Sequence, residues 1–326
     1  MIGVVYKMKL NVGAIGYKNH AKKILEIFKK IKNVFISKIY YPKKINGIKF
    51  TRNLNDLINC DVILILSPNY THYKYLKFFE KRFKGYIFCE KPPAVSLKEL
   101  NKLKNDPEKT FFNFNLRYGK IFNILNDLIK RKKLGNIYHA YISSSHLFGK
   151  NINYKKSWRS KQTLNKLGLV ENVGIHYIDL FSILFNKPKE IIHYSSNIVK
   201  ETSSYDNCSV IAKYPNNLKL FIYLSYVTAF DFHIKLIGTN GIFEIYDNKA
   251  QLLIGHKKNI HTKRYCRSSV SKTWKISEED IMNNSLEKSI DYFLNICLKN
   301  KKFPLHDFKN SIEINKQILK SKKIIN

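Results

Sequence analysis

The feature that most constrains the fold is an unbroken apolar run, Val62–Leu66, which is closed by Ser67-Pro68-Asn69. A strand without polar alternation is buried on both faces, as in a parallel sheet covered by helices. Tyr86–Cys89 is a second run of this kind, and strand-like stretches at residues 9–15 and 33–40 precede both. These four stretches predict a parallel sheet in the first third of the chain.

Helical patterns separate these strands. Apolar residues recur at helical spacing over residues 20–31, and a second helix is expected over residues 71–83. Ser96 and Glu99 stand at the spacing of a capping box, which starts a third helix. Because strands alternate with helices, we predict an α/β domain with a doubly wound parallel sheet over residues 1–115.

The pattern changes after about Asn115. An amphipathic helix near residues 121–129 is followed mainly by strands. The strand-like stretches are residues 136–146, 190–199, 207–214, 218–227 and 232–246, the last with a hairpin turn at Gly238–Gly241. They predict a second α/β domain, residues 116–326, with an open, mainly antiparallel sheet. A last helix at about residues 307–323 is expected to pack back on the first domain.

The composition indicates a soluble protein of a reducing compartment. The five cysteines are scattered, with no Cys-x-x-Cys, so we expect neither a disulfide framework nor a zinc site. No apolar run approaches the length needed to span a membrane, and the first residues lack the pattern of a signal peptide. We therefore expect a cytoplasmic location, no membrane partner and no metal, with translation starting at Met1 or Met8.

A formal net charge of +34 suggests nucleic acid as a partner. However, only seven of the 58 basic residues are Arg, which nucleic-acid-binding proteins favour for bidentate contacts. The lysines are spread along the chain, and a composition rich in Lys, Asn and Ile is what AT-rich codon usage gives. We favour this compositional explanation and expect no specific nucleic-acid partner, while nucleic-acid binding stays open as an alternative.

The segment VGAIGYKNHAKKI, residues 12–24, joins the first strand to the first helix, where dinucleotide-binding proteins hold a pyrophosphate on backbone N–H groups. Started at Gly16, the G-x-G-x-x-G spacing meets Lys18 and Ala21 in place of glycines. Lys18 could offer an ammonium to phosphate, and Ala21 is small enough for close packing of helix on strand. Taken alone, this loop leaves a nucleotide site and an ordinary turn equally open.

The second strand ends in YYPKK, residues 40–44, without the Asp or Glu that usually binds the ribose hydroxyls of NAD. Tyr40 or Tyr41 could stack on adenine, and Lys43 or Lys44 could meet the 2′-phosphate of NADP. This arrangement favours NADP, although lysine is common throughout the chain.

Two further segments carry polar residues that suggest chemistry. Glu90 and Lys91 follow a buried strand, where a partly desolvated lysine is suited to proton transfer; the alternative is a surface lysine that opens a loop. In the otherwise apolar helix ENVGIHYIDLFSILF, Asn172, His176 and Asp179 share one face at 100° per residue. Three aligned polar groups on a buried helix favour a ligand site over an ordinary core histidine.

Taken in chain order, VGAIG, SPNYTH, EKP, FNLRY, WRS, GIHYID and IGTNGIFEIYDN resemble the glucose–fructose oxidoreductase and inositol dehydrogenase family, Gfo/Idh/MocA. The resemblance covers nearly the whole chain. It implies a Rossmann domain, a second domain with an open sheet and a nicotinamide cofactor, NAD or NADP. It also implies a sugar, nucleotide sugar or related polyol as substrate, and a homo-oligomer formed through the open sheet.

The resemblance assigns roles to individual residues. Lys91 and His176 would act at the reacting carbon, while Asn172 stands where the family usually has Asp and cannot relay a proton. The residues expected to bind the cofactor are Gly13, Ile15, Gly16, Tyr17, Lys18, Tyr40, Lys43, Ser67, Pro68, Asn69, His72, Glu90, Lys91 and Asn115. Those expected to bind the substrate are Arg117, Trp158, Arg159 and Asp179, whose two arginines favour an anionic sugar. The alternative is that these arginines contact the cofactor or tie the two domains together.

We therefore expect an NAD(P)-dependent oxidoreductase that transfers hydride to or from a sugar carbon, with a role in sugar synthesis for surface glycans. The departures from the family pattern at Lys18 and Asn172 leave one alternative. In that alternative the chain is a family member that has lost hydride chemistry and acts as a ligand-binding or scaffold protein.

Overall fold

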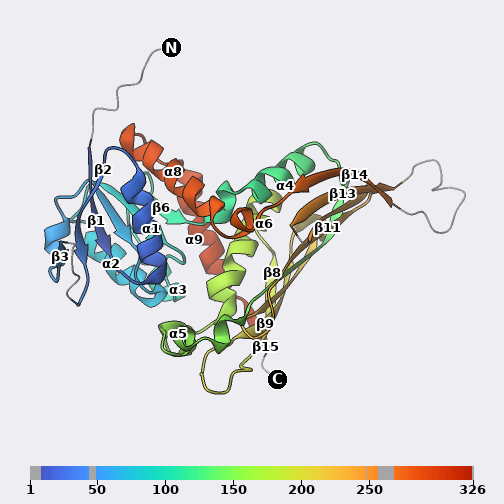
Figure 1. Cartoon of the computed structure of the whole chain (residues 1–326), viewed down its shortest axis with the longest axis horizontal. Coiled ribbons are helices and arrows are strands. Elements are labelled where there is room, and N and C mark those ends of the chain that lie inside the picture. Colours follow the sequence, from blue (N-terminus) through green and yellow to red (C-terminus); the bar gives the residue numbers. More distant parts are fainter. Residues whose placement is uncertain (1–8, 44–48, 247, 256–267, 325–326) are drawn as a thin grey trace, which may run out of the picture. The chain divides into compact units, whose positions relative to one another are not determined.

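The computed structural model describes residues 9–43, 49–246, 248–255 and 268–324 (Figure 1). Three features of the sequence lie outside the described residues: Lys44, Cys266 and the two alternative starts at Met1 and Met8. None of the described helices is long and apolar enough to cross a membrane.

Packing contacts divide the chain into two units. Unit 1 comprises the chain up to Asn115 together with Glu287–Leu319. Unit 2 comprises Leu116–Leu286 together with the chain from Lys320. Each unit is therefore built from two separate segments of the sequence.

Unit 1 contains the parallel sheet that the apolar runs predict. Its strands are β1 Leu10–Ile15, β2 Val34–Tyr40, β3 Phe50–Thr51, β4 Val62–Ile65, β5 Tyr86–Glu90 and β6 Thr110–Asn113. They lie in the order β3-β2-β1-β4-β5-β6, and every pair is parallel. Strands β4 and β5 are buried at every residue, as an uninterrupted apolar run requires. The predicted doubly wound sheet is confirmed.

The helices of unit 1 follow the strands as expected, with shorter bounds. They are α1 Asn19–Lys30, α2 His72–Phe79, α3 Leu97–Leu100, α8 Asn284–Leu298, which begins just before the unit boundary, and α9 Leu305–Leu319. Helix α2 ends at Phe79 rather than Phe83, because the chain tightens into a turn in which Arg82 N–H donates to the Phe79 carbonyl. At α3 the Ser96 side chain accepts from Glu99 N–H, which is the half of the capping box that the structure contains.

Aromatic side chains join α1 and α8 to the sheet of unit 1. The ring of Phe88 in β5 lies 5.8 Å from that of Phe28 in α1 and 5.2 Å from that of Phe293 in α8. All three side chains are fully buried. Burying one such side chain stabilises a fold by roughly 1.5–3 kcal/mol. The segment from Glu287 is thus part of the core of unit 1, which the sequence patterns did not predict.

Unit 2 contains the open, mainly antiparallel sheet that was predicted. Its strands are β7 Ile137–Ser145, β8 Glu190–Ser196, β9 Asn207–Lys213, β10 Lys219–Ser225, β11 Asp231–Gly238, β12 Gly241–Tyr246, β13 Lys249–Gly255, β14 Ser268–Lys275 and β15 Lys322–Ile324. Their order is β14-β13-β12-β11-β7-β10-β9-β8-β15. Among the described strand pairs of this sheet, only β7–β10 and β8–β15 are parallel. The turn between β11 and β12 is the hairpin predicted at Gly238–Gly241.

One face of this sheet is covered by helices. Figure 1 shows α4 Lys120–Lys130 and α6 Ile175–Phe185 on the same side of the long sheet layer. A π-helical turn, Val170–Gly174, leads into α6 and packs against β9 and β10. The short helices α5 Ile152–Lys155 and α7 Glu278–Met282 complete the described helices of the unit. The residues of β10 alternate, with Leu220, Ile222 and Leu224 buried on the covered face.

The predicted end of the last helix is wrong. Helix α9 stops at Leu319, and residues 322–324 form β15 on the edge of the sheet of unit 2. In β15, backbone N–H and C=O groups that would have bonded within a longer helix pair with β8 instead. The ammonium of Lys322 also lies 2.9 Å from a carboxylate oxygen of Glu190. Strands β13 and β14 were also missed by the sequence patterns.

Candidate functional site

In a parallel sheet, ligands bind beyond the carboxyl ends of the strands. In unit 1 the glycine loop follows β1, the Ser67-Pro68-Asn69 segment follows β4, and Lys91 follows β5. These strands are neighbours and parallel, so the three segments leave the same edge. The residues predicted to bind the cofactor are thus brought to one edge of unit 1, except Gly13 and Ile15, which are buried within β1.

The glycine loop has the geometry of a nucleotide-binding turn. Gly16 has φ +103, and a Cβ built on it would lie 2.8 Å from the carbonyl oxygen of Leu66. Only glycine fits this position without strain, because the backbone is left-handed and the end of β4 is in contact. Its N–H donates to the carbonyl of Tyr40 at 3.2 Å. The loop therefore touches the ends of both strands that flank β1.

The start of α1 favours a negatively charged ligand. Lys18 is the exposed N-cap residue, the first turn has no acidic residue, and α1 is twelve residues long. The ammonium of Lys22 lies 5.0 Å from the ring centre of Tyr17. A helix N-terminus with free N–H groups and nearby lysines suits a pyrophosphate. The residues present therefore fit a dinucleotide, even though Lys18 replaces a glycine.

His72 connects two of the loops at this edge. Its Nδ1 lies 2.8 Å from the carbonyl oxygen of Pro92, and its Nε2 lies 2.8 Å from that of Ser67. The ring is fully buried, and burial lowers the pKa of His72. Because both ring nitrogens face backbone carbonyls, His72 positions the loops after β4 and β5. Asn69, from the same segment, is also buried.

A hydrogen-bonded chain surrounds Glu90, the residue before Lys91. The Glu90 carboxylate accepts from Asn113 Nδ2 at 2.7 Å and lies 3.3 Å from His20 Nε2. Asn113 in turn accepts from the Ser289 hydroxyl at 2.8 Å. Burial raises the pKa of Glu90, but the charge of His20 and the two hydrogen bonds outweigh it and lower the pKa to about 2. Glu90 is therefore a fixed negative charge beside Lys91, which is half-buried.

His20 is a site residue that the sequence patterns missed. It stands in the first turn of α1, four positions after Gly16, and half of its side chain is exposed. The spacing gave no reason to connect it with Glu90, which lies 70 residues away. The contact became evident only because the sheet order brings the ends of β1 and β5 within reach of α1.

The end of β2 carries tyrosines and no acidic residue. The ring of Tyr40 packs edge-on against Tyr75 at 6.0 Å, and Tyr41 packs edge-on against Tyr17 at 6.3 Å. Lys43 is exposed. This part of the edge therefore presents aromatic rings and a cation.

In unit 2 the predicted helix begins with a wide turn. Val170–Gly174 is π-helical, and Ile175 N–H donates back to the carbonyl of Val170, five residues earlier. Rotation per residue is smaller in such a turn, so the 100° rule does not apply from Asn172 to His176. Asn172 is buried and His176 is half-buried. Single π-turns of this kind are frequent at functional sites.

Two predicted substrate residues are bound to each other. The guanidinium of Arg117 contacts the carboxylate of Asp179 through Nε–Oδ2 at 2.8 Å and Nη2–Oδ1 at 2.6 Å. Both side chains are buried. The pair links the 3₁₀ turn Asn115–Tyr118 to α6, the helix that carries His176. The guanidinium of Arg117 therefore donates two hydrogen bonds to a side chain of the protein itself, which the sequence patterns did not indicate.

Arg159 differs from Arg117 in its surroundings. Its guanidinium stacks over the ring of Trp158 at 4.6 Å, and both residues are half-buried in the turn Trp158–Ser160. Asn165 fixes the turn by donating to the Arg159 carbonyl at 2.8 Å. Within the described part of the chain, no carboxylate lies within ion-pair distance of Arg159, whereas Arg117 and Arg131 each have one.

A wall of aromatic rings lies next to Arg159. Tyr154 and Tyr226 pack edge-on at 5.6 Å, and both are buried. Burial raises the pKa of Tyr226 to about 12, and the charge of Arg159 lowers it in part, which places the guanidinium near this ring. A cation beside aromatic rings can bind the oxygens of an anion on one side and the apolar face of a sugar on the other.

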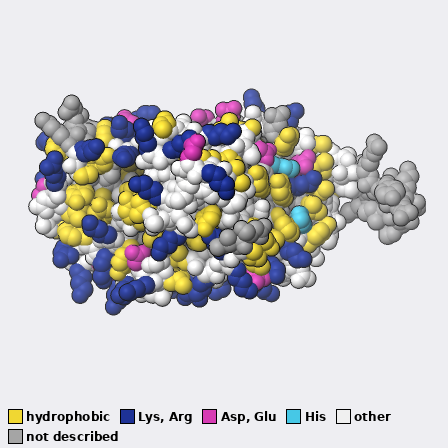
Figure 2. Space-filling view, turned by 90° about the horizontal axis from the view of Figure 1, so that it is seen from below, with side chains coloured by type: hydrophobic (Ala, Val, Ile, Leu, Met, Phe, Trp, Pro, Cys, Tyr) yellow, Lys and Arg dark blue, Asp and Glu magenta, His cyan; other side chains and the backbone are white. Residues whose placement is uncertain are grey.

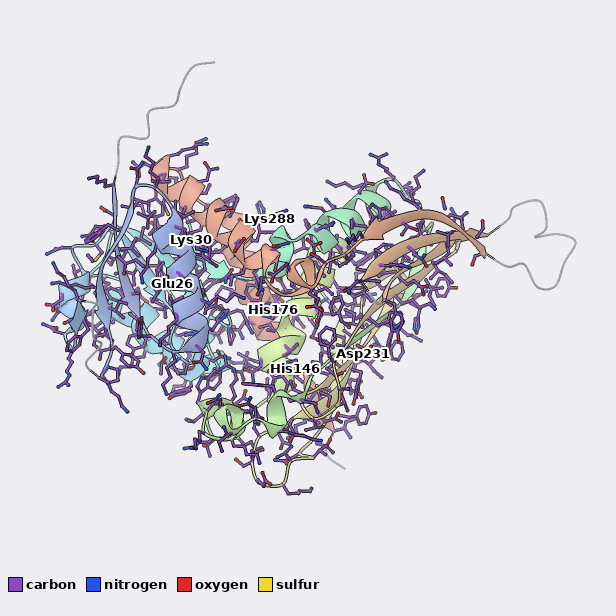
Figure 3. The ribbon with its side chains drawn as sticks, viewed as in Figure 1. Glu26, Lys30, His146, His176, Asp231 and Lys288 are labelled. Atoms are coloured by element: carbon purple, nitrogen blue, oxygen red, sulfur yellow. The ribbon has the colours of Figure 1, made fainter. Side chains whose placement is uncertain are left out.

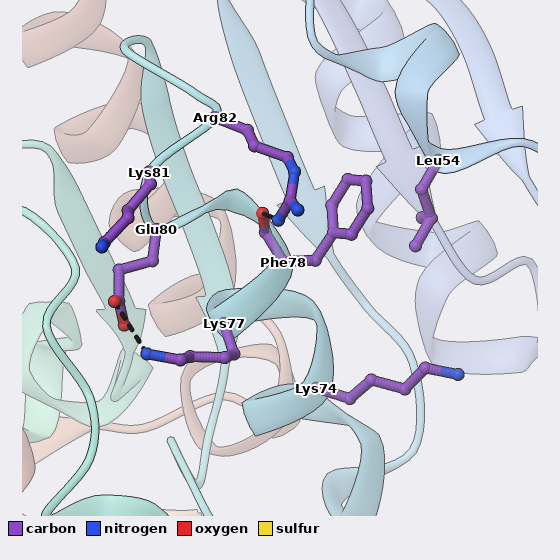
Figure 4. Close-up of a pocket in the computed structure, with 7 residues that line it drawn as sticks. All are labelled: Leu54, Lys74, Lys77, Phe78, Glu80, Lys81 and Arg82. Atoms are coloured by element: carbon purple, nitrogen blue, oxygen red, sulfur yellow. Dashed lines mark hydrogen bonds and ion pairs between the residues drawn. The ribbon is translucent and has the colours of Figure 1, made fainter.

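An open hollow lies elsewhere in unit 1. It has a volume of about 630 Å³ and is lined by Leu54, Lys74, Lys77, Phe78, Glu80, Lys81 and Arg82 (Figure 4). Lys77 pairs with Glu80 at 2.8 Å, and Arg82 donates to the carbonyl of Phe78. It contains none of the predicted site residues. Figure 2 shows Lys and Arg side chains spread over the visible face, with Asp and Glu between them.

No group of three or more His, Cys, Asp or Glu side chains that could hold a metal ion exists within the described ranges. The four described cysteines, Cys60, Cys89, Cys208 and Cys297, are free and buried.

Comparisons with protein families match both halves of the chain. Residues 10–110 match the family model described as the oxidoreductase family with an NAD-binding Rossmann fold. Residues 122–244 match the model of the GFO/IDH/MocA C-terminal domain. Together the two matches cover more than two thirds of the chain.

Individual relatives agree with this assignment. The chain is 30% identical over 190 residues to glucose-6-phosphate 3-dehydrogenase of Bacillus subtilis (strain 168). That match spans 53% of this chain and 53% of the relative, about half the length of each. Among solved structures, myo-inositol 2-dehydrogenase from Lactobacillus plantarum is similar with a TM-score of 0.73 and 15% identity, covering 94% of this chain and 95% of that chain. An oxidoreductase from Agrobacterium radiobacter, in complex with NAD⁺, L-tartaric acid and magnesium, gives a TM-score of 0.75 at 14% identity and covers 95% of each chain.

Proposed function

Because the chain belongs to the GFO/IDH/MocA oxidoreductase family, we propose that it is an NAD(P)-dependent dehydrogenase or reductase of sugars that carry an anionic group. The observation that carries the substrate class is Arg159. Its half-buried guanidinium is stacked on Trp158 and has no carboxylate partner within the described residues. A half-buried guanidinium without a carboxylate partner can donate two parallel hydrogen bonds to a phosphate or carboxylate.

The cofactor half of the proposal is supported by unit 1. The left-handed Gly16, the close approach to Leu66 and the basic start of α1 suit a pyrophosphate. A bound nicotinamide would supply the hydride acceptor or donor. NAD-binding Rossmann domains of this family provide this chemistry, and the family model that covers residues 10–110 is of that class.

We assign the proton chemistry to Lys91 and His176. In the oxidising direction, His176 takes the proton of the sugar hydroxyl, and Lys91 holds that hydroxyl and stabilises the charge that develops on its oxygen. Glu90, the residue before Lys91, places a buried negative charge next to it in the chain. Positioned groups of this kind contribute roughly 10²–10⁴-fold to a rate. Asn172 is an amide, so it orients partners without moving a proton.

The relative from Bacillus subtilis is named for a sugar phosphate, glucose 6-phosphate, which agrees with an anionic substrate. We extend the proposal to the wider class of sugar phosphates and nucleotide sugars, since each offers phosphate oxygens beside a sugar ring. A role in the synthesis of surface-glycan sugars is the finer expectation within this class, and it remains a prediction. A homo-oligomer formed through the open sheet of unit 2 likewise remains a prediction.

The test is a steady-state assay with NAD⁺ and NADP⁺ against glucose 6-phosphate, UDP-glucose, glucose and myo-inositol. We expect kcat/KM for an anionic sugar to exceed that for neutral glucose at least tenfold. Arg159→Met keeps apolar packing on Trp158 but should raise the KM of the anionic sugar. Arg131→Met is the matched control, because Arg131 pairs with Asp127 on the surface of α4. Turnover of neutral polyols alone, unaffected by Arg159→Met, would reject the anionic class.

A second candidate is a binding protein without hydride chemistry. Asn172 favours it, because a buried amide stands where the family resemblance leads one to expect a carboxylate. This candidate predicts that the chain binds a sugar but neither NADH nor NADPH. Titration of cofactor fluorescence with protein distinguishes the two, since the oxidoreductase requires cofactor binding and the binding protein does not.

A further inference from the structure

His146 directly follows β7 and has one ring nitrogen fixed by the backbone. Its Nδ1 accepts a hydrogen bond from Phe148 N–H at 3.3 Å, so His146 is the N-cap of the turn Leu147–Lys150. A nitrogen that accepts from an N–H group carries no proton. In the neutral ring the single proton must therefore be on Nε2, which makes this nitrogen a hydrogen-bond donor.

The ring of His146 is also held in place by its neighbours. It stacks on Tyr226 with centres 4.8 Å apart and planes tilted by 30°, and it meets the ring of Phe148 edge-on at 6.0 Å. Backbone bonds tie the same segments together, since His146 N–H donates to the Ser225 carbonyl at 3.0 Å and Gly149 N–H donates to the Tyr226 carbonyl at 2.7 Å. The direction of the Nε2–H bond is thus set by packing.

The surroundings keep this ring neutral. Burial lowers the pKa of His146, and no carboxylate opposes that effect. Nε2 is not among the fully buried polar atoms and has no hydrogen-bond partner within the described residues. An oriented donor that is half-shielded and lacks a protein acceptor is available to a ligand.

His146 borders the same aromatic wall as Arg159. The ring of Tyr226 stacks on His146 on one side, and the charge of Arg159 acts on the same tyrosine. Tyr154, which packs against Tyr226 and against Phe148, also lies in the field of Arg159. All of these residues belong to unit 2 (His146 and His176 are labelled in Figure 3).

We propose that His146 is a specificity-determining residue, whose neutral Nε2–H group donates a hydrogen bond to an oxygen of the same sugar that Arg159 binds through its anionic group. This inference rests on the proposed function. A neutral donor selects a sugar with an oxygen at that position without adding charge, whereas Arg159 selects the anion. A sugar lacking that oxygen would leave the Nε2–H group unpaired, which is what makes such a donor selective.

Two variants separate the donor from the structural roles of the ring. His146→Asn keeps a side-chain oxygen that can cap Phe148 N–H but removes the distal donor. His146→Phe keeps the ring that stacks on Tyr226 but removes the cap and the donor. His139→Asn is the matched control, because His139 lies on β7, the strand that His146 follows, and stacks on Phe221 at 4.9 Å without bordering Arg159.

The measurements are KM and kcat for glucose 6-phosphate or UDP-glucose, whichever the wild-type chain turns over faster, and KM for the cofactor. We expect both His146 variants to raise the KM of the sugar about tenfold, the scale of one lost hydrogen bond, and to leave the cofactor KM unchanged. His139→Asn should match the wild type.

A purely structural role gives a different pattern, in which one of the two His146 variants keeps the wild-type sugar KM, because each preserves one structural feature. That pattern, or an unchanged sugar KM in both variants, overturns the inference while the proposed function stands. Absence of turnover of every sugar of the panel by the wild-type chain overturns both.

Discussion

Arg117 and Asp179 form a buried, two-point ion pair between the turn that opens unit 2 and the helix that carries His176. The two residues are 62 positions apart in the sequence. Removing one partner of such a pair leaves a buried charge, while removing both does not. Removing one partner of this pair should therefore destabilise unit 2 more than removing both partners.

Asp179→Ala should destabilise the chain by roughly 3–5 kcal/mol, because Arg117 then lacks its carboxylate in a buried position. The double variant Arg117→Met, Asp179→Leu should recover a large part of that loss, since apolar groups of similar volume replace both charges. Urea unfolding followed by circular dichroism measures both. Equal destabilisation of the single and double variants would contradict a cost that arises from an unpaired charge.

Gly16→Ala should abolish cofactor binding and destabilise unit 1 by roughly 1–3 kcal/mol. The residue has φ +103, and the new Cβ would lie 2.8 Å from the backbone oxygen of Leu66, which cannot move aside. Cofactor fluorescence and urea unfolding report the two effects. Gly255→Ala is the control, because no heavy atom lies within 4 Å of a Cβ at that glycine, so this variant should behave like the wild type.

Lys91→Ala and His176→Ala should each lower kcat by about 10²–10⁴-fold while leaving the dissociation constant of the cofactor within a few-fold of the wild-type value. Each removes a group that acts on the reacting hydroxyl, and neither removes the glycine loop. Lys77→Ala, which removes a surface lysine paired with Glu80, is the control for the loss of a lysine. Near-normal turnover in both single variants would be incompatible with the assigned roles.

The stability of unit 1 should fall in acid because of Glu90. The folded-state pKa of Glu90 is about 2, below the value of about 4.3 of an unfolded glutamate. The contribution of Glu90 to the free energy of unfolding is therefore complete above about pH 5 and is lost as the pH falls from about 5 to 2. The contribution is about 3 kcal/mol. Glu90→Gln should remove this part of the acid dependence, as measured by urea unfolding at pH 3 to 7.

Glu190 is the matched control for this experiment. The hydrogen bond from Lys213 and that from Lys322 lower the pKa of Glu190 to about 2, the same value as for Glu90. It lies near the surface, where water screens the charges, so Glu190→Gln should alter the acid dependence much less. If the two substitutions changed the acid dependence of the free energy of unfolding equally, the buried position of Glu90 would not strengthen its contribution to stability.

The chain should bind NADPH more tightly than NADH. The end of β2 has no acidic residue for the ribose hydroxyls, and Lys43 is exposed beside Tyr40 and Tyr41. Lys43→Glu should reverse the preference by opposing a 2′-phosphate and offering an acceptor to a ribose hydroxyl. Lys32→Glu, which changes the charge by the same amount at the opposite end of β2, should leave the preference for NADPH unchanged. Fluorescence titration of the wild type and both variants with NADH and NADPH gives the six dissociation constants.

The architecture of the sheets was readable from the sequence because it depends on local patterns. The run Val62–Leu66 predicted a strand buried on both faces, and β4 is one. The segment of α8 also contained a readable signal, since apolar residues recur at helical spacing at Leu286, Ile290, Phe293 and Leu294, all of which are buried. Helix α8 was therefore predictable from this spacing, although the sequence analysis did not predict it. Strand β15 had no such signal, because three residues at a sheet edge are too few to show a periodic pattern.

The site was less predictable because its contacts join distant segments. Gly16 and Lys91 could be placed at one sheet edge from strand order alone. The contacts His20–Glu90 and Arg117–Asp179 depend on which strands and turns become neighbours, and no spacing rule encodes that. The π-turn before His176 has no signature in the sequence, so the ideal helical angle was applied where the backbone departs from it.

The return of the chain to unit 2 through β15 means that neither unit corresponds to one continuous stretch of gene. A single crossover in recombination could not move unit 1 into another protein with α8 and α9 still attached. A stop codon just before Lys320 would leave the helices of unit 1 complete and remove an edge strand from unit 2. Loss of the residues from Lys320 onward would therefore affect the sheet of unit 2, although α9, which directly precedes them, belongs to unit 1.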